Sequence, residues 1–277
     1  MVFIDPVTSA VSGGGAERVV FDKIDATLTA TWAARPPAIP LAQWLTIVAR
    51  ARQQLADFAN ASTVTMWAAD FLSYASVNPY PWSMSAQVAG GTIATISGTK
   101  NHPGIVALKS TAAANSGYAL LTVANCLCLQ GNESTQMVFA PVATTNTVVR
   151  MGFSDTYQLV EPTDGIWIHI AGTTLTGRTA SSAARSTTPS SHTVTPGTWY
   201  RAAISLNAAG TIATFELYEC AAPSVVIWTD TLAANIPLGS GREMGHAIVS
   251  YNTGVAGPAE LIHLDYVEAV IGRTLVR

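Results

Sequence analysis

The sequence predicts a mainly β protein: an antiparallel β-sandwich at residues 67–277 that follows a small, partly helical N-terminal region at residues 1–66. Of the 277 residues, 49% are hydrophobic and 11% are charged, which supplies enough apolar surface for a sizeable core. Beyond residue 66, short runs rich in β-branched and aromatic residues follow one another and are separated by Gly, Pro, Asn and Ser. A helical period is clear only before residue 67.

The N-terminal region begins with a glycine-rich break at residues 12–15, which is typical of a turn or hinge. Neither a following Lys-Ser/Thr nor a spaced third glycine accompanies the break, so a phosphate-binding loop is not predicted. Prolines between residues 36 and 40 end the next segment, and a helix is predicted over residues 41–60. We expect this region to serve attachment or oligomerisation.

The predicted helix carries an apolar stripe at spacings of three and four residues. Its members are Leu41, Trp44, Val48, Ala51, Leu55 and Phe58. Such a stripe packs either on a neighbouring part of the chain or against copies of itself around a symmetry axis, and both interpretations stay open. The helix is too short to form a stable coiled coil alone, so a trimer would need help from the larger domain.

The second region contains the predicted strands, with no helix between them, which favours an antiparallel sandwich. The strands are 88–96, 104–109, 118–129, 136–142, 147–153, 165–171, 199–207, 211–218, 225–229, 246–251 and 261–271. In 199–207 the even-numbered positions carry Tyr, Ala, Ile and Leu and are predicted to face the core. In 261–271 the polar His263 and Asp265 alternate with Ile262, Leu264 and Tyr266 and are predicted to share the other face.

Residues 172–198 form a tract of small polar residues that breaks this pattern. One interpretation is a solvated pair of edge strands with a loop between them. The other is a ligand or partner loop, in which Arg178, Arg185 and His192 contact an acidic glycan or a neighbouring protein.

Charge and cysteine content narrow the range of partners. The 14 basic and 17 acidic residues form no basic stripe, so we do not expect nucleic acid as a partner. Every apolar run is shorter than the roughly 18 residues of a spanning helix, so we expect no membrane insertion. Cys126, Cys128 and Cys220 are too few for a disulfide framework, and no metal or cofactor is predicted. Without a secretory signal, synthesis and assembly are expected in a reducing cytoplasm.

The sequence predicts no catalytic residues. Glycoside hydrolysis needs two carboxylates on either side of one bond, and no acid-x-acid-x-acid run supplies such a pair on a strand. The five histidines are scattered, and there is no Gly-x-Ser-x-Gly elbow. Sugar binding without cleavage remains open, because exposed aromatic faces stack on sugar rings; the candidates are Tyr80, Trp82 and Tyr251.

Several segments of the second region resemble one known family. The sequence KNHPGIVAL at residues 100–108, followed by residues 110–111 and 115–118, is similar to the opening of the concanavalin A-like jelly-roll domain in many tailed-bacteriophage virion proteins. PGTWYR at residues 196–201, residues 207–211 and Phe215 resemble paired strands of that domain. The turns at residues 236–237 and 241–243 and the closing LDYV at residues 264–267 also fit. The resemblance covers about residues 67–277.

The resemblance implies a non-enzymatic virion protein made in the cytoplasm of a host bacterium. Such a protein would be a tail or head fibre or spike, attached to capsid, neck or tail proteins by its N-terminal region and exposing its jelly-roll domain to a host-surface glycan. Homotrimers are common among such proteins, and the last strand of the domain lies beside the first. A capsid or neck decoration protein is the alternative, and a polysaccharide-degrading enzyme is a weaker one.

Overall fold

The computed structural model describes residues 64–69, 87–88, 90–99, 101–102, 104–111, 113–121, 128–239, 241–254 and 260–272. For residues 64–69, 87–88, 121 and 272 it describes the backbone alone. The predicted helix at 41–60 with its apolar stripe, and the candidates Tyr80 and Trp82, lie outside these ranges. They stay predictions, as does the division into two regions.

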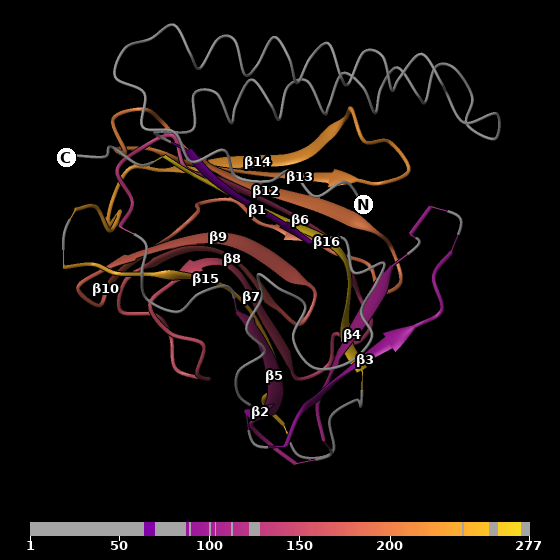
Figure 1. Cartoon of the computed structure of the whole chain (residues 1–277). Coiled ribbons are helices and arrows are strands. Elements are labelled where there is room, and N and C mark those ends of the chain that lie inside the picture. Colours follow the sequence, from indigo (N-terminus) through magenta and orange to yellow (C-terminus); the bar gives the residue numbers. More distant parts are fainter. Residues whose placement is uncertain are drawn as a thin grey trace, which may run out of the picture. The chain divides into compact units, whose positions relative to one another are not determined.

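Within the described ranges, sixteen strands form two eight-stranded sheets that face each other as a sandwich (Figure 1). Sheet A runs β14 (Val226–Leu232), β13 (Ala213–Glu219), β12 (Tyr200–Leu206), β6 (Ser134–Pro141), β16 (Glu260–Gly272), β4 (Ile105–Lys109) and β3 (Thr92–Ile96), with β1 (Val64–Ala69) also paired to β16. Sheet B runs β10 (Ala184–Thr187), β9 (Thr174–Ser181), β8 (Gly165–Ala171), β7 (Thr147–Ser154), β15 (Gly245–Asn252), β5 (Ser116–Leu121) and β2 (Gln87–Val88), with β11 (His192–Thr193) also paired to β9. The predicted mainly β, antiparallel sandwich is confirmed.

The core fills the space between the inner faces of the two sheets. Its largest fully buried side chains include Tyr200, Phe139, Phe153 and Phe215. The predicted alternation in residues 199–207 is confirmed, because the even-numbered side chains are at most 5% exposed. Every second residue of this strand therefore faces the core, as the pleat of a β-strand requires.

The predicted strand at 88–96 is two strands that belong to different sheets. β2 pairs with β5 in sheet B, and β3 pairs with β4 in sheet A. The chain crosses between the sheets at Gly90 and Gly91. Gly90 has a φ of +88°, and a Cβ on Gly91 would lie 1.8 Å from the carbonyl oxygen of Gly117. Glycine is needed here because no side chain fits so close to another backbone.

The polar tract at 172–198 contains three strands, the first of which is an interior strand of sheet B. β9 has neighbours on both sides, β8 on one and β10 and β11 on the other. Leu175, Gly177 and Thr179 alternate toward the core and are buried. A Cβ on Gly177 would lie 2.5 Å from the ring of Phe215, so the small residue makes room for a large one from sheet A. Among the described strands β10 and β11 pair with β9 alone, so they are the edge strands that the sequence predicts.

β16 contains a bulge that changes which residues face the core. Its register against β6 shifts between Leu264 and Tyr266, so Asp265 is an extra residue. Beyond the bulge, Val267, Ala269 and Ile271 are buried and Tyr266 is not. The predicted inward position of Tyr266 is therefore wrong, whereas His263 and Asp265 do lie on the outer side.

β1 and β16 are neighbours in sheet A, as the family resemblance implies. No helix in the described part of the chain is long and apolar enough to cross a membrane. Nor do the described residues include a cluster of three or more side chains suited to holding a metal ion.

Candidate functional site

The outer face of sheet A carries a groove with a volume of about 480 Å³, which we call the Trp199 groove. Its wall comes from β6, β12 and β16 and from the segments before β4 and after β13. The residues that define it are Asn101, His102, Trp199, Arg201, Cys220 and Asp265. Arg201 points outward because it alternates with the buried Tyr200 and Ala202 on β12.

A stacked pair of rings forms one wall of the groove. The imidazole of His102 lies on the indole of Trp199, with ring centroids 3.9 Å apart and planes tilted by 14°. Nδ1 of His102 is 2.9 Å from Oδ2 of Asp265. The bulge in β16 places Asp265 here, so an aromatic face and a carboxylate meet in one groove.

Arg201 is held rigidly on β12, which β6 separates from β16. Its guanidinium carbon lies 3.8 Å from the centroid of the Tyr218 ring, and it donates hydrogen bonds to Oε1 of Gln136 and to the carbonyl oxygen of Pro223. These contacts fix the guanidinium before any ligand arrives, which lowers the entropic cost of binding. The Trp199 groove therefore offers preformed donors and acceptors.

Cys220 lines the same groove but is not an activated nucleophile. Burial, and then the negative charge of Asp265, raise the pKa of its thiol. A raised pKa keeps the sulfur protonated at neutral pH, whereas nucleophilic cysteines have a lowered pKa.

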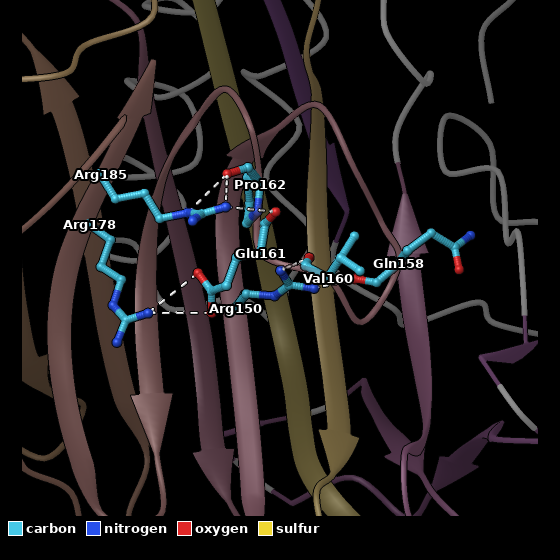
Figure 2. A network of polar contacts seen from close by, with 7 residues as sticks. All are labelled: Arg150, Gln158, Val160, Glu161, Pro162, Arg178 and Arg185. Carbon is cyan, nitrogen blue, oxygen red and sulfur yellow. Dashed lines mark hydrogen bonds and ion pairs between the residues drawn. The ribbon is translucent and has the colours of Figure 1, made fainter. Parts of the chain in front are cut away.

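The outer face of sheet B is covered by the loop between β7 and β8, residues 155–164, which we call the strap (Figure 2). Arg150 on β7 donates to the carbonyl oxygens of Gln158 and Val160. Arg178 on β9 donates from Nη1 to both carboxylate oxygens of Glu161, each at 3.3 Å. Side chains from two strands thus hold the strap down.

Two of the three candidate loop residues take part in this arrangement. Arg178 and Arg185 lie side by side on β9 and β10, and Arg185 donates to the carbonyl oxygens of Glu161 and Pro162 (Figure 2). His192 lies apart on β11, with its ring edge-on to Tyr200 at a centroid distance of 6.5 Å. The structure therefore brings the two arginines together but not the histidine.

Tyr251 is a correction to the sequence-based hypothesis. It lies on the outer face of sheet B but is 9% exposed, in a cluster with Ala119 and Val249 against which Leu159 of the strap packs. The guanidinium of Arg150 lies over its ring at 5.8 Å. The ring is covered, so it is not an open stacking surface.

Sequence analysis identified few of the residues that form the Trp199 groove. His102 and Asp265 are 163 positions apart, and no local pattern joins them. The alternation in residues 199–207 was the one available signal, because it placed Trp199 and Arg201 on the outer face.

The two-sheet architecture is that of the concanavalin A-like jelly-roll proteins. The structure is similar to SO2946, a protein of unknown function from Shewanella oneidensis MR-1, with a TM-score of 0.66 and 14% identity over 88% of this chain and 99% of that one. Residues 101–265 match the family described as SO2946-like, C-terminal domain, and the chain belongs to this family. Among curated proteins no match was found.

Two further solved structures share the fold at lower similarity. One is the CBM2 module of the evolved Dit protein of Lactobacillus casei BL23 phage J-1, with a TM-score of 0.53 and 11% identity over 76% of this chain and 97% of that one. The other is the Emp47p carbohydrate recognition domain, with a TM-score of 0.53 and 13% identity over 77% of this chain and 99% of that one.

Proposed function

We propose that the sandwich is a non-enzymatic glycan-binding domain of a phage virion protein, and that the Trp199 groove holds the sugar. The observation that carries this proposal is the meeting of an indole, a carboxylate and a fixed guanidinium in one groove of about 480 Å³. That volume lies within the roughly 300–1,000 Å³ range of small-molecule sites.

The chemistry of the groove suits a sugar ring. A pyranose has an apolar C–H face that stacks on an aromatic ring and hydroxyl groups around its edge. Trp199 is half-buried and lines the groove, and His102 fixes its ring from one side. Asp265 accepts hydrogen bonds from hydroxyl groups, while Arg201 and Asn101 donate them.

The spacing of the carboxylates on the outer face of sheet A favours sugar binding over cleavage of a glycosidic bond. Glu216 and Glu268 lie in one row across sheet A, but three strand spacings separate them. At about 4.8 Å per spacing they are about 14 Å apart, beyond the separations that glycoside hydrolysis uses. Asp265 is engaged by His102, and Glu268 accepts from Tyr266 and Gln136.

The proposed place in a virion is a tail or head fibre or spike that attaches through residues 1–66. The family resemblance of the sequence supports it, and so does the similar fold of the phage Dit module. The likeness to modules named for carbohydrate recognition and CBM2 favours contact with a host glycan over capsid decoration.

Binding of the full-length chain to a panel of purified bacterial surface polysaccharides tests the proposal. Trp199→Ala should weaken the binding of a recognised polysaccharide by about fivefold to 150-fold, because one stacked ring contributes about 1–3 kcal/mol. Ile212→Ala is the matched control, since Ile212 is an exposed apolar residue of sheet A's β12–β13 turn outside the groove.

Equal binding by wild type and Trp199→Ala would remove the groove from the proposal. Release of reducing ends from the same polysaccharides would contradict the non-enzymatic assignment. Failure of every polysaccharide to bind would favour the decoration role.

A further inference from the structure

Five buried polar atoms without a hydrogen-bond partner converge on the outer face of sheet B. Among the described residues they are Nε of Arg150, Nε1 of Trp167, Nδ1 of His169, Oγ1 of Thr176 and Nε of Arg178. Arg150 lies opposite His169, His169 opposite Thr176, and Trp167 opposite Arg178 in the register of β7, β8 and β9. They therefore form one continuous patch, which we call the donor patch.

The burial of this patch is costly as it stands. A buried polar group with no partner has given up its hydrogen bonds to water without replacement, and native proteins keep few such groups. Arg150 is 3% exposed, Trp167 1% and His169 5%. Three of the atoms are N–H donors, so what the donor patch lacks is acceptors.

The patch also carries an excess of positive charge. The guanidinium groups of Arg150, Arg178 and Arg185 lie near two carboxylates, those of Glu161 and Asp155, and among the described residues only Glu161 forms an ion pair with one of them. Arg150 is bound to neutral carbonyl oxygens only, and no ion pair is formed by it within the described residues. His169 adds no charge, because burial and then the two nearby arginines lower its pKa to about 3.

The strap supplies imperfect substitutes for an anionic partner. Glu161 presents its two oxygens to one nitrogen of Arg178 at 3.3 Å, longer than the roughly 2.7–2.9 Å of a good charge-assisted bond. The carbonyl oxygens of Gln158 and Val160 occupy the terminal nitrogens of Arg150 (Figure 2). The side chain of Val160 itself points to solvent, 65% exposed.

We propose that the donor patch is a second binding site, for a saccharide bearing a carboxylate, and that Glu161 occupies the position of the ligand's carboxylate until the ligand displaces the strap. The ligand carboxylate pairs with Arg178 and Arg150. Its hydroxyl oxygens accept from the remaining N–H groups, including the indole N–H of Trp167. This site lies on the other sheet from the Trp199 groove and does not depend on it.

Calorimetric titration of the full-length chain with oligogalacturonate tests the proposal, with the methyl-esterified oligosaccharide and inorganic phosphate as comparison probes. Glu161→Gln keeps the shape of the strap but removes the competing charge, so it should tighten oligogalacturonate binding about tenfold. Arg178→Gln should weaken it by a similar factor. Glu219→Gln, a half-buried carboxylate of sheet A, should leave it unchanged.

Hydrogen exchange supplies a readout that a surface-charge effect would not move. Oligogalacturonate should increase amide exchange in residues 155–164, because the strap leaves the sheet. Absence of binding, an unchanged affinity in Glu161→Gln, or equal binding of phosphate would each overturn the proposal. Trp199→Ala should not alter this binding, so the failure of one site is distinguishable from that of the other.

Discussion

At the scale of a residue, two buried histidines show how position in the sandwich changes the pKa of a side chain. His246 is fully buried on the inner face of β15, with Nε2 2.7 Å from Oγ1 of Thr135. His169 is buried on the outer face of β8, beside two arginines. Burial lowers the pKa of both imidazoles to about 3. Each is therefore neutral in the folded protein well below its ordinary pKa.

This pair predicts a loss of stability in acid. The ordinary pKa of 6.5 applies in the unfolded chain, so between about pH 6.5 and 3 the unfolded state binds more protons than the folded state. The free energy of unfolding should fall with decreasing pH by up to about 1.4 kcal/mol per pH unit for each histidine. Urea unfolding at several pH values measures the slope. His169→Gln and His246→Gln should each make it shallower, and an unchanged slope in both would contradict the assignment.

At the scale of an element, β9 shows why a polar strand can lie inside a sheet. Its inner positions are small, and Gly177 receives the ring of Phe215 from the opposite sheet. From the sequence alone, the small polar residues of this strand predict solvent exposure. The large apolar side chain that covers them belongs to another strand and leaves no signal in the local pattern.

Gly177→Ala should destabilise the sandwich, because the new methyl group would lie 2.5 Å from the Phe215 ring. We expect a loss of about 1–3 kcal/mol in the free energy of unfolding, the usual cost of overpacking a core. Gly197→Ala is the comparison variant: its φ is +77° but nothing lies near its Cβ, so only backbone strain of about 1 kcal/mol applies. Chemical denaturation of both variants decides the point, and equal losses would speak against the packing role of Gly177.

The parts of the fold that could be predicted are those specified by residues close together in the sequence. β-Rich runs bounded by Gly, Pro, Asn and Ser located β4, β6, β7, β8 and the strands from β12 to β16, and period-two alternation in β12 also predicted its buried face. The crossing at Gly91 and the bulge at Asp265 were not predictable, since both depend on which strand lies alongside. The same limit applies to the Trp199 groove, whose His102 and Asp265 meet only after β16 has paired. Arg178 and Arg185 were found from charge in a neutral tract, but their contact with the strap required the register of sheet B.

At the scale of the whole molecule, the two outer faces have different properties. Sheet A carries an open groove with preformed polar groups, while sheet B carries a donor patch closed by its own loop. Ligands on opposite faces would not compete for space, so one domain has room for two saccharides.

The oligomeric state is a property of the whole molecule, and the sequence makes a prediction about it. If residues 41–60 form an intersubunit helix, light scattering should give about three times 29.0 kDa for the purified chain. Val48→Asp combined with Leu55→Asp should then yield a soluble, folded monomer. A monomeric wild type would mean that the apolar stripe has another partner, and an unchanged oligomer in the double variant would exclude the stripe as the seam.

The position of β16 has a consequence for how the protein is made. β16 lies between β6 and β4 in sheet A and also pairs with β1, yet it is the last of these strands to leave the ribosome. Until then the centre of sheet A is missing, and the edges of β4 and β6 that pair with β16 have no strand between them. Such long-range closure is slow, and the incomplete sheet exposes strand edges that aggregate. We therefore expect the domain to complete its fold only once β16 has emerged, with newly made chains protected by a chaperone until β16 is inserted.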